Sequence, residues 1–288
     1  MKRSFSVRMQ EYRRDPLSLI LKLAVWLAAA VTVTALVFVI VYILIKGIPH
    51  LKPELFAWKY NSENVSLTPA LINTLFMTVL SLLIAVPVGI GAAVYLTEYA
   101  RRGNKLVGAV RVTAETLSGI PSIVYGLFGS LFFVKALHLG LSLLSGALTL
   151  GIMILPLIMR TTEEALTAVP DSYREGSFGL GAGRLRTVFK IVLPSAVPGI
   201  LAGVILGIGR IVGESAALIF TAGTVAEIAS TPMKSARTLS VHMYVISGEG
   251  LYIDQTYATA VVLLVFVVII NALSSFAAAR IGRNKENG

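Results

Sequence analysis

Long stretches without charged residues limit what this chain can fold into more than any other feature. The first runs from Leu23 to Ile45 and contains 23 residues, none of them charged. An α-helix rises 1.5 Å per residue, so a run of this length crosses the ~30 Å hydrocarbon core of a bilayer. Only 14% of the 288 residues are charged, against about 25% in ordinary soluble domains. The sequence therefore predicts an all-α integral membrane protein.

Six apolar runs of this kind occur, and we expect each to form one transmembrane helix. The predicted spans are Leu23–Ile45, Leu75–Tyr95, Leu117–Val134, Leu141–Met159, Ala196–Phe220 and Thr259–Ala279. They make a single transmembrane domain, residues 23–279, between a basic segment (1–22) and a short tail (280–288). The first span is too long for a signal-peptide core and no small-residue cleavage site follows it, so we expect it to be retained.

The distribution of lysine and arginine sets the orientation. Six spans put both termini on one side, and 18 of the 25 basic residues fall in the segments of that side. Cytoplasmic loops carry such an excess, so both termini are predicted to be cytoplasmic. The net charge of +10 is thereby explained by topology, and a nucleic-acid partner is not expected. The chain is predicted to be a multi-pass protein of a bacterial or archaeal cytoplasmic (inner) membrane, in contact with lipid.

A polar, glycine-rich segment, Arg174–Pro194, lies between the fourth and fifth predicted spans. Ser172 and Glu175 have the S-x-x-E spacing of a capping box, in which the two side chains bond each other's backbone N–H groups. This spacing predicts a short helix that begins just after Ser172. The helix should end near Gly179 or Gly181, because glycine readily adopts the left-handed conformation of a helix cap.

The same segment resembles the signature loop of ABC importer permeases, E-A-A-x-x-x-G-x(9)-I-x-L-P, at every spacing. Two small residues, Gly176 and Ser177, replace the two alanines. In that family the loop forms a coupling helix that docks on a separate ATPase. The resemblance implies a type I importer permease fold with a cytoplasmic coupling loop at residues 160–195. The coupling residues it implies are Ser172, Glu175, Gly176, Ser177, Gly181, Ile191, Leu193 and Pro194.

Two charged residues, Arg210 and Glu214, lie inside the fifth predicted span. Each costs roughly 2.5–3.5 kcal/mol at the centre of a span. Their spacing of four places them on one helix face, where they are expected to pair. We interpret them as part of a translocation path, in which Arg210 binds an oxyanion with its planar fork and Glu214 holds Arg210 when the path is empty. A purely structural ion pair is the alternative.

Two further stretches, Gly119–Gly126 and Gly209–Ala216, resemble the PstA family of phosphate ABC importer permeases, and the likeness covers about residues 70–280. The resemblance implies a heterodimer with a PstC-like permease, two copies of an ABC ATPase and an external phosphate-binding protein. The chain has no G-x-x-x-x-G-K-[ST] motif, so ATP and Mg²⁺ are expected on the partner ATPase. No cofactor, metal or enzymatic activity is expected in this chain.

Several alternatives stay open at this point. The chain could be the PstC-like partner permease, or a permease for another oxyanion. A self-sufficient secondary anion transporter would explain Arg210 and Glu214, but not the coupling loop, and no clear inverted repeat is present. A membrane enzyme is disfavoured because the three histidines are scattered. The segment Thr238–Ile246 reads equally as a strand or a short re-entrant helix.

Overall fold

The computed structural model describes residues 16–101 and 103–286, which are helical with no strand among them. The helices are α2 (Pro16–Gly47), α3 (Thr68–Val94), α4 (Lys105–Ser118), α5 (Ser122–Gly129), α6 (Leu143–Thr167), α7 (Asp171–Gly179), α8 (Arg184–Thr187), α9 (Leu193–Val212), α10 (Ala216–Thr221), α11 (Leu239–Glu249) and α12 (Ile253–Glu286). Five helical segments are long and apolar enough to cross a membrane, and a sixth span exists if the bent pair α4 and α5 counts as one. The predicted all-α membrane fold is confirmed.

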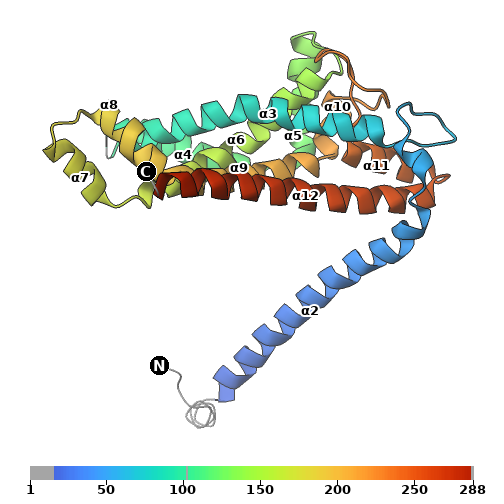
Figure 1. The fold of residues 1–288 in the computed structure, drawn as a ribbon, viewed down its shortest axis with the longest axis horizontal. Helices are drawn as coiled ribbons and strands as arrows, with labels where there is room; N and C mark the ends of the chain where they lie inside the picture. Colours follow the sequence, from blue (N-terminus) through green and yellow to red (C-terminus); the bar gives the residue numbers. More distant parts are fainter. Residues whose placement is uncertain (1–15, 102, 287–288) are drawn as a thin grey trace.

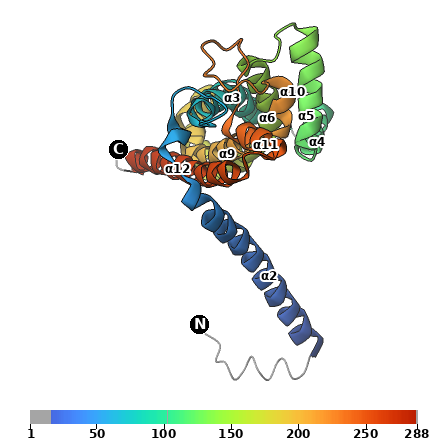
Figure 2. The same cartoon turned by 90° about the vertical axis from the view of Figure 1, so that its right-hand side faces the viewer.

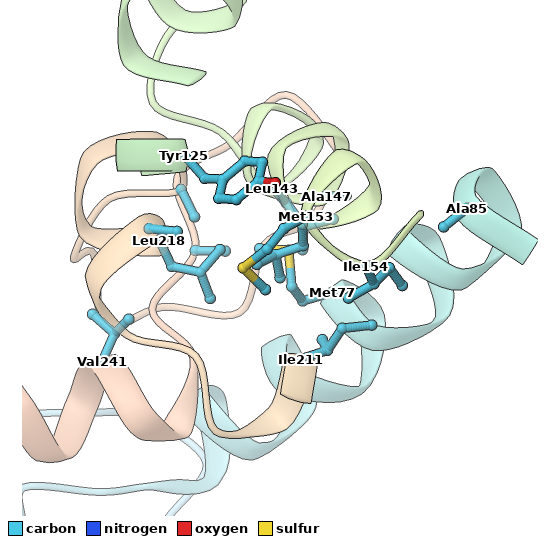
Figure 3. Packing of buried hydrophobic residues seen from close by; sticks show 14 of the residues in the cluster. Met77, Ala85, Tyr125, Leu143, Ala147, Met153, Ile154, Ile211, Leu218 and Val241 are labelled. Carbon is cyan, nitrogen blue, oxygen red and sulfur yellow. The ribbon is translucent and has the colours of Figure 1, made fainter. Parts of the chain in front are cut away.

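The body of the molecule is a bundle in which α3, α6, α9 and α12 run side by side (Figure 1). Its centre is α6, which packs on both α3 and α9. Buried side chains such as Met77, Met153 and Leu218 fill the space between these helices and the short α5 and α10 (Figure 3). Lipid is as apolar as these side chains, so close packing holds the helices together more than the hydrophobic effect does.

Helix α2 leaves the bundle. It meets α12 only near its C-terminal end, where the rings of Tyr42 and Tyr257 are 5.9 Å apart, and then runs away from the body in both views (Figures 1 and 2). Its apolar side chains are exposed along almost its whole length. The first predicted span is therefore present as a helix without partners among the described residues over most of its length.

The third predicted span is not a straight helix. Its polar upstream segment is already helical as α4, and α4 meets the following helix at a bend of 104°. The bend falls at Gly119-Ile120-Pro121, because proline disfavours a helical conformation for the residue before it. The span proper begins at Ser122 and continues from α5 through a π-helical turn to Ala136. The expected bounds, Leu117–Val134, were wrong at the N-terminal side.

The fifth predicted span differs at both ends. Proline commonly ends a helix, but Pro194 lies inside one helical segment that runs from Arg184 to Val212. A π-helical turn at Val188–Val192 directly precedes it, and such wide turns allow a helix to pass a proline that lacks the N–H donor. The helix then stops at Val212, and residues 216–221 form the separate helix α10. The prediction of one helix over Ala196–Phe220 was wrong.

Segment 239–249 is the helix α11, which decides between the two readings left open for residues 238–246. It lies outside the candidate spans and packs against the N-terminal part of α3 and against α12. Asn73 of α3 fixes the loop before it, because its side chain donates to the carbonyl oxygens of Glu227 and Arg237 and accepts from the N–H of Ala229. These hydrogen bonds hold the loop before α11 against the N-terminal part of α3.

Candidate functional site

The coupling segment protrudes from one end of the bundle as α7 and α8 (Figure 1). Helix α7 begins at Asp171, two residues earlier than predicted, with Pro170 in the N-cap position and no side-chain cap. Ser172 consequently lies inside the first turn, where its hydroxyl cannot cap the helix, and the predicted capping box with Glu175 is wrong. The helix ends at Gly179, and Gly181 has a φ of +81°, as the glycine signal predicted.

Most of α7 faces away from the protein. Glu175 and Gly176 are exposed, whereas Ser177 is buried. The Ser177 hydroxyl is hydrogen-bonded to Thr187 at the end of α8, with 2.8 Å between the two oxygens. A small polar residue is needed there because α7 and α8 approach closely at this point. Ser177 therefore ties α7 to α8, while Glu175 and Gly176 remain free for a partner.

Large apolar side chains are exposed on the same protruding segment and at the start of the helical segment Arg184–Val212. They are Tyr173, Phe178, Leu180, Leu185 and Phe189. Leu180, at the tip between α7 and α8, is 91% exposed. Exposed apolar groups in such a cluster indicate an interaction surface. We call these five residues the apolar tip.

The C-terminal part of the loop has a different environment. Ile191, Leu193 and Pro194 are half-buried, and they flank Val192, which is fully buried against Leu166. These positions therefore hold the base of the protruding segment on the bundle. The signature positions fall into two groups, an exposed one on α7 and a packed one at the start of α9.

Arg210 lies near the C-terminal end of α9 and lines a cavity of about 430 Å³ between α4, α6 and α9. Five other charged side chains line the same cavity: Arg111, Glu115, Arg160, Glu163 and Glu164. Two of its arginines are already paired, because Arg111 Nε lies 3.3 Å from Glu163 Oε1 and Arg160 Nε 3.1 Å from Glu164 Oε1. Within the described chain, Arg210 has no carboxylate within 4.0 Å.

Glu214 does not pair with Arg210. Because α9 ends at Val212, the two residues no longer share a helix face, and the Glu214 side chain instead accepts the N–H of Ala217 at 3.0 Å. Its backbone carbonyl accepts a hydrogen bond from the hydroxyl of Ser240 on α11. The predicted ion pair was wrong, and the structure separates the two members of the predicted path into a cavity arginine and a helix cap.

Arg111 and Arg160 were not recognised from the sequence as site residues, since both were assigned to the basic excess of cytoplasmic segments. A signal existed for Arg160, which has glutamates three and four residues later on one helix face. Arg111 and Glu163 are 52 residues apart, so only the fold brings them together. The cavity is therefore formed by contacts between distant parts of the chain, and its local sequence signal is the spacing of Arg160 with Glu163 and Glu164.

This bundle, with a short helix protruding between two spans, has the architecture of the membrane subunits of ABC transporters. A chain of a bacterial alginate ABC transporter aligns with a TM-score of 0.62 and 18% identity, covering 95% of this chain and 97% of that one. The inward-facing MetNI methionine ABC transporter gives a TM-score of 0.54 at 23% identity, covering 76% and 93%. Residues 85–286 match the family of binding-protein-dependent transport system inner membrane components, and the chain belongs to that family.

Relatives with closer sequences carry related names. The probable ABC transporter permease protein YqgI of Bacillus subtilis is 34% identical over 263 residues, which is 85% of this chain and 89% of the relative. The phosphate transport system permease protein PstA of Pasteurella multocida is 40% identical over 189 residues, 65% of this chain and 67% of the relative. The chain is thus a multi-pass inner-membrane transport component, and the predicted PstA-type resemblance is confirmed.

Proposed function

We propose that this chain is the transmembrane permease subunit of an ATP-driven importer of inorganic phosphate, working with a separate ATPase. The observation that carries the proposal is the pairing, in one chain, of an exposed helical tip on the cytoplasmic side and a cavity arginine without an ion-pair partner among the described residues. The exposed tip provides a docking surface for an ATPase, and the cavity arginine provides a binding site for an anion. Relatives named as phosphate permeases support the choice of substrate.

The ATPase would dock on the apolar tip and on the face of α7 that carries Ser172, Glu175 and Gly176. Five exposed apolar side chains would bury against a protein partner there, and Glu175 and Gly176 lie free beside them. In this proposal Ser172, Glu175 and Gly176 belong to the contact, Ser177 and Gly181 shape the helix that makes it, and Ile191, Leu193 and Pro194 anchor it to the bundle. ATP and Mg²⁺ bind the partner.

The phosphate path would pass the cavity that Arg210 lines. A guanidinium binds an oxyanion bidentately, and the two other arginines of the cavity are paired with carboxylates. With Glu115, the lining carries three arginines and three glutamates, so its formal charges balance. A site with one available cation can hold an anion and still release it. Glu214 contributes to the path by fixing α10 and α11 next to Arg210, not by holding the arginine itself.

A second permease subunit, of the PstC-like kind, would cover α2. This helix is exposed almost throughout and diverges from its own bundle (Figure 2). Transmembrane helices associate through packing and not through exclusion from lipid, so α2 gains most from a partner that offers a complementary face. An extracytoplasmic phosphate-binding protein would deliver substrate at the loop around α11.

ATP-driven phosphate uptake by vesicles containing the whole assembly tests this function. Wild type is compared with Glu175→Arg and with Arg210→Ala. We expect Glu175→Arg to lose co-purification of the ATPase, and Arg210→Ala to keep the assembly but lose uptake. Normal uptake in both variants would contradict the proposed roles.

Two additional arms address the competing functions. Phosphate transport by this chain alone in liposomes would favour a secondary transporter over an importer subunit. Competition of labelled phosphate uptake by sulfate and molybdate separates a phosphate importer from a permease for another oxyanion. We expect no transport by the chain alone and no competition.

A further inference from the structure

The guanidinium of Arg174 connects α7 to the helical bundle. Arg174 of α7 donates to both carboxylate oxygens of Glu98, from Nη2 to Oε1 at 2.7 Å and from Nε to Oε2 at 3.4 Å. Glu98 belongs to the π-helical turn Tyr95–Tyr99 that ends α3. The two side chains are only 16% and 8% exposed, although 76 residues separate them in sequence. This is a forked, largely buried ion pair between α7 and the end of α3.

The same guanidinium also closes the C-terminal end of α6. Nη2 donates to the carbonyl oxygen of Leu166 at 2.9 Å, and Nη1 to that of Val169 at 2.8 Å. The last carbonyls of a helix lack donors within the helix, and a cation at this end is favoured by the helix dipole. Arg174 therefore joins α7 to α3 and α6 at one point.

Helix α7 has little else to attach it. Ser177 is its only buried residue, and the hydrogen bond of Ser177 to Thr187 links it to α8. Within the described chain, the side-chain hydrogen bonds of α7 to other helices are those of Arg174 and Ser177. Its aromatic side chains, Tyr173 and Phe178, are exposed. Besides the chain connections at its two ends, α7 can therefore transmit a force to the bundle through two polar contacts, one toward α3 and α6 and one toward α8.

We propose that Arg174 and Glu98 are positioning residues for energy coupling, which transmit displacement of α7 to α3 and α6. The proposal rests on the proposed function of α7 as the ATPase-docking helix. A bidentate pair suits this task because two parallel bonds oppose rotation and sliding, whereas a single contact acts as a pivot. Without the pair, a displacement of α7 would still reach α6 through residues 168–170 and the bond to Leu166, but α3 would follow it less closely.

The test measures ATP hydrolysed per phosphate imported by the complete assembly in proteoliposomes. Glu98→Gln keeps the size of the side chain but removes its charge and one acceptor. We expect the ATPase to remain bound and the ATP-to-phosphate ratio to rise about tenfold, as loss of a charge-assisted bond implies. Arg174→Lys, which keeps the charge but not the fork, should raise the ratio in the same direction.

Asp171→Asn is the matched control. Asp171 contacts the same guanidinium at 3.3 Å, but its side chain is 80% exposed, and exposed ion pairs contribute little. The ratio should therefore stay at the wild-type value. A wild-type ratio in Glu98→Gln would overturn the proposal. Loss of the ATPase from Glu98→Gln would overturn it as well, because the pair would then serve docking and not transmission.

A second readout does not depend on the transported substrate. The chain contains no cysteine, so spin labels can be placed at Leu83→Cys on α3 and Leu206→Cys on α9, both of which are exposed. We expect ATP to change the distance between the labels in the otherwise wild-type assembly and not in Glu98→Gln. If the wild type imports no phosphate, but ATP changes the label distance in it and not in Glu98→Gln, the proposed substrate fails while the transmission role stands. An equal change in both would overturn the role.

Discussion

Glu214 accepts the backbone N–H of Ala217 with 3.0 Å between its Oε1 and the nitrogen. The side chain is 9% exposed and provides the first turn of α10 with an acceptor for one of its free N–H groups. Through its carbonyl oxygen, the same residue also accepts the hydroxyl of Ser240 on α11. Glu214 thus connects the end of α9 to the two short helices α10 and α11.

This bond predicts different effects for two substitutions of Glu214. Glu214→Gln retains an oxygen acceptor, so we expect nearly wild-type thermal stability. Glu214→Ala leaves a buried N–H without a partner and should lower the free energy of unfolding by about 1–3 kcal/mol. Thermal unfolding of the purified assembly in detergent measures both. Equal losses in the two variants would show that the charge, and not the hydrogen bond, matters.

Arg210→Lys separates charge from geometry. Lysine keeps the positive charge in the cavity but cannot bind an oxyanion with a planar fork. We expect ATP-driven phosphate uptake to fall at least about tenfold at equal assembly, since a bond to a charged group is lost. Arg160→Lys is the control, because its exposed pair with Glu164 can form with lysine too. Unchanged uptake in Arg210→Lys would argue against bidentate binding.

Two glycines in helices predict opposite responses to alanine. A Cβ at Gly126 would lie 2.8 Å from the Cα of Ala217 on α10, a backbone atom that cannot rotate away, whereas a Cβ at Gly91 would meet nothing within 4 Å. Gly126→Ala should therefore cost about 1–3 kcal/mol of stability through overpacking. Gly91→Ala should be neutral or slightly stabilising. Melting temperatures of the two assemblies decide the matter, and equal values would refute the role of α5–α10 contact.

His242 predicts a dependence of stability on pH. The imidazole is fully buried on α11 and packs edge-on against Tyr60 at 6.0 Å. Burial, with a smaller contribution from Arg237, lowers the pKa of His242 from 6.5 to about 4. The unfolded chain therefore binds a proton between these values that the folded chain does not. Stability is full above pH 6.5 and falls as the pH drops toward 4, by roughly 3 kcal/mol in total.

A matched variant isolates this effect from other titrating groups. His242→Leu has a similar volume but no titratable group, so its unfolding free energy should vary less between pH 7 and pH 4 than that of the wild type. The difference between the two curves, measured by thermal or denaturant unfolding, is the contribution of His242. Parallel curves would mean that the pKa of His242 is the same in the folded and the unfolded chain.

The predictable part of the fold is the part that hydropathy and local spacing report. Apolar runs locate α2, α3, α6 and α12, and the loop motif locates α7 and its glycine end. The end of α9 was missed because Gly213 interrupts an apolar run without changing its hydropathy. The start of the fifth span was set at Ala196, after Pro194, because the π-helical turn that accommodates this proline has no sequence signal of its own. The predicted N-cap, Ser172, was wrong by two residues, since Pro170 takes the N-cap position and the helix begins at Asp171.

The candidate site shows the same division. Glu175 and Arg210 stand out in the sequence, one through a spaced motif and the other as a charge in an apolar run. The cavity around Arg210 depends on contacts between α4, α6 and α9, and Arg111 reaches it only because α4 is folded against α6. Glu98 was likewise unremarkable in the sequence, because its partner Arg174 is distant along the chain and becomes its neighbour only in the folded protein.

The continuous helical segment from Arg184 to Val212 can act as a lever, because the contact with α7 and the cavity arginine lie on the same segment. Thr187, which is bonded to the coupling helix, lies near one end, and Arg210 lies near the other. At 1.5 Å per residue these two positions are about 35 Å apart, so a tilt of about 5° displaces one end relative to the other by about 3 Å. That displacement is about the length of a hydrogen bond, so it is large enough to make or break the contact between Arg210 and an anion.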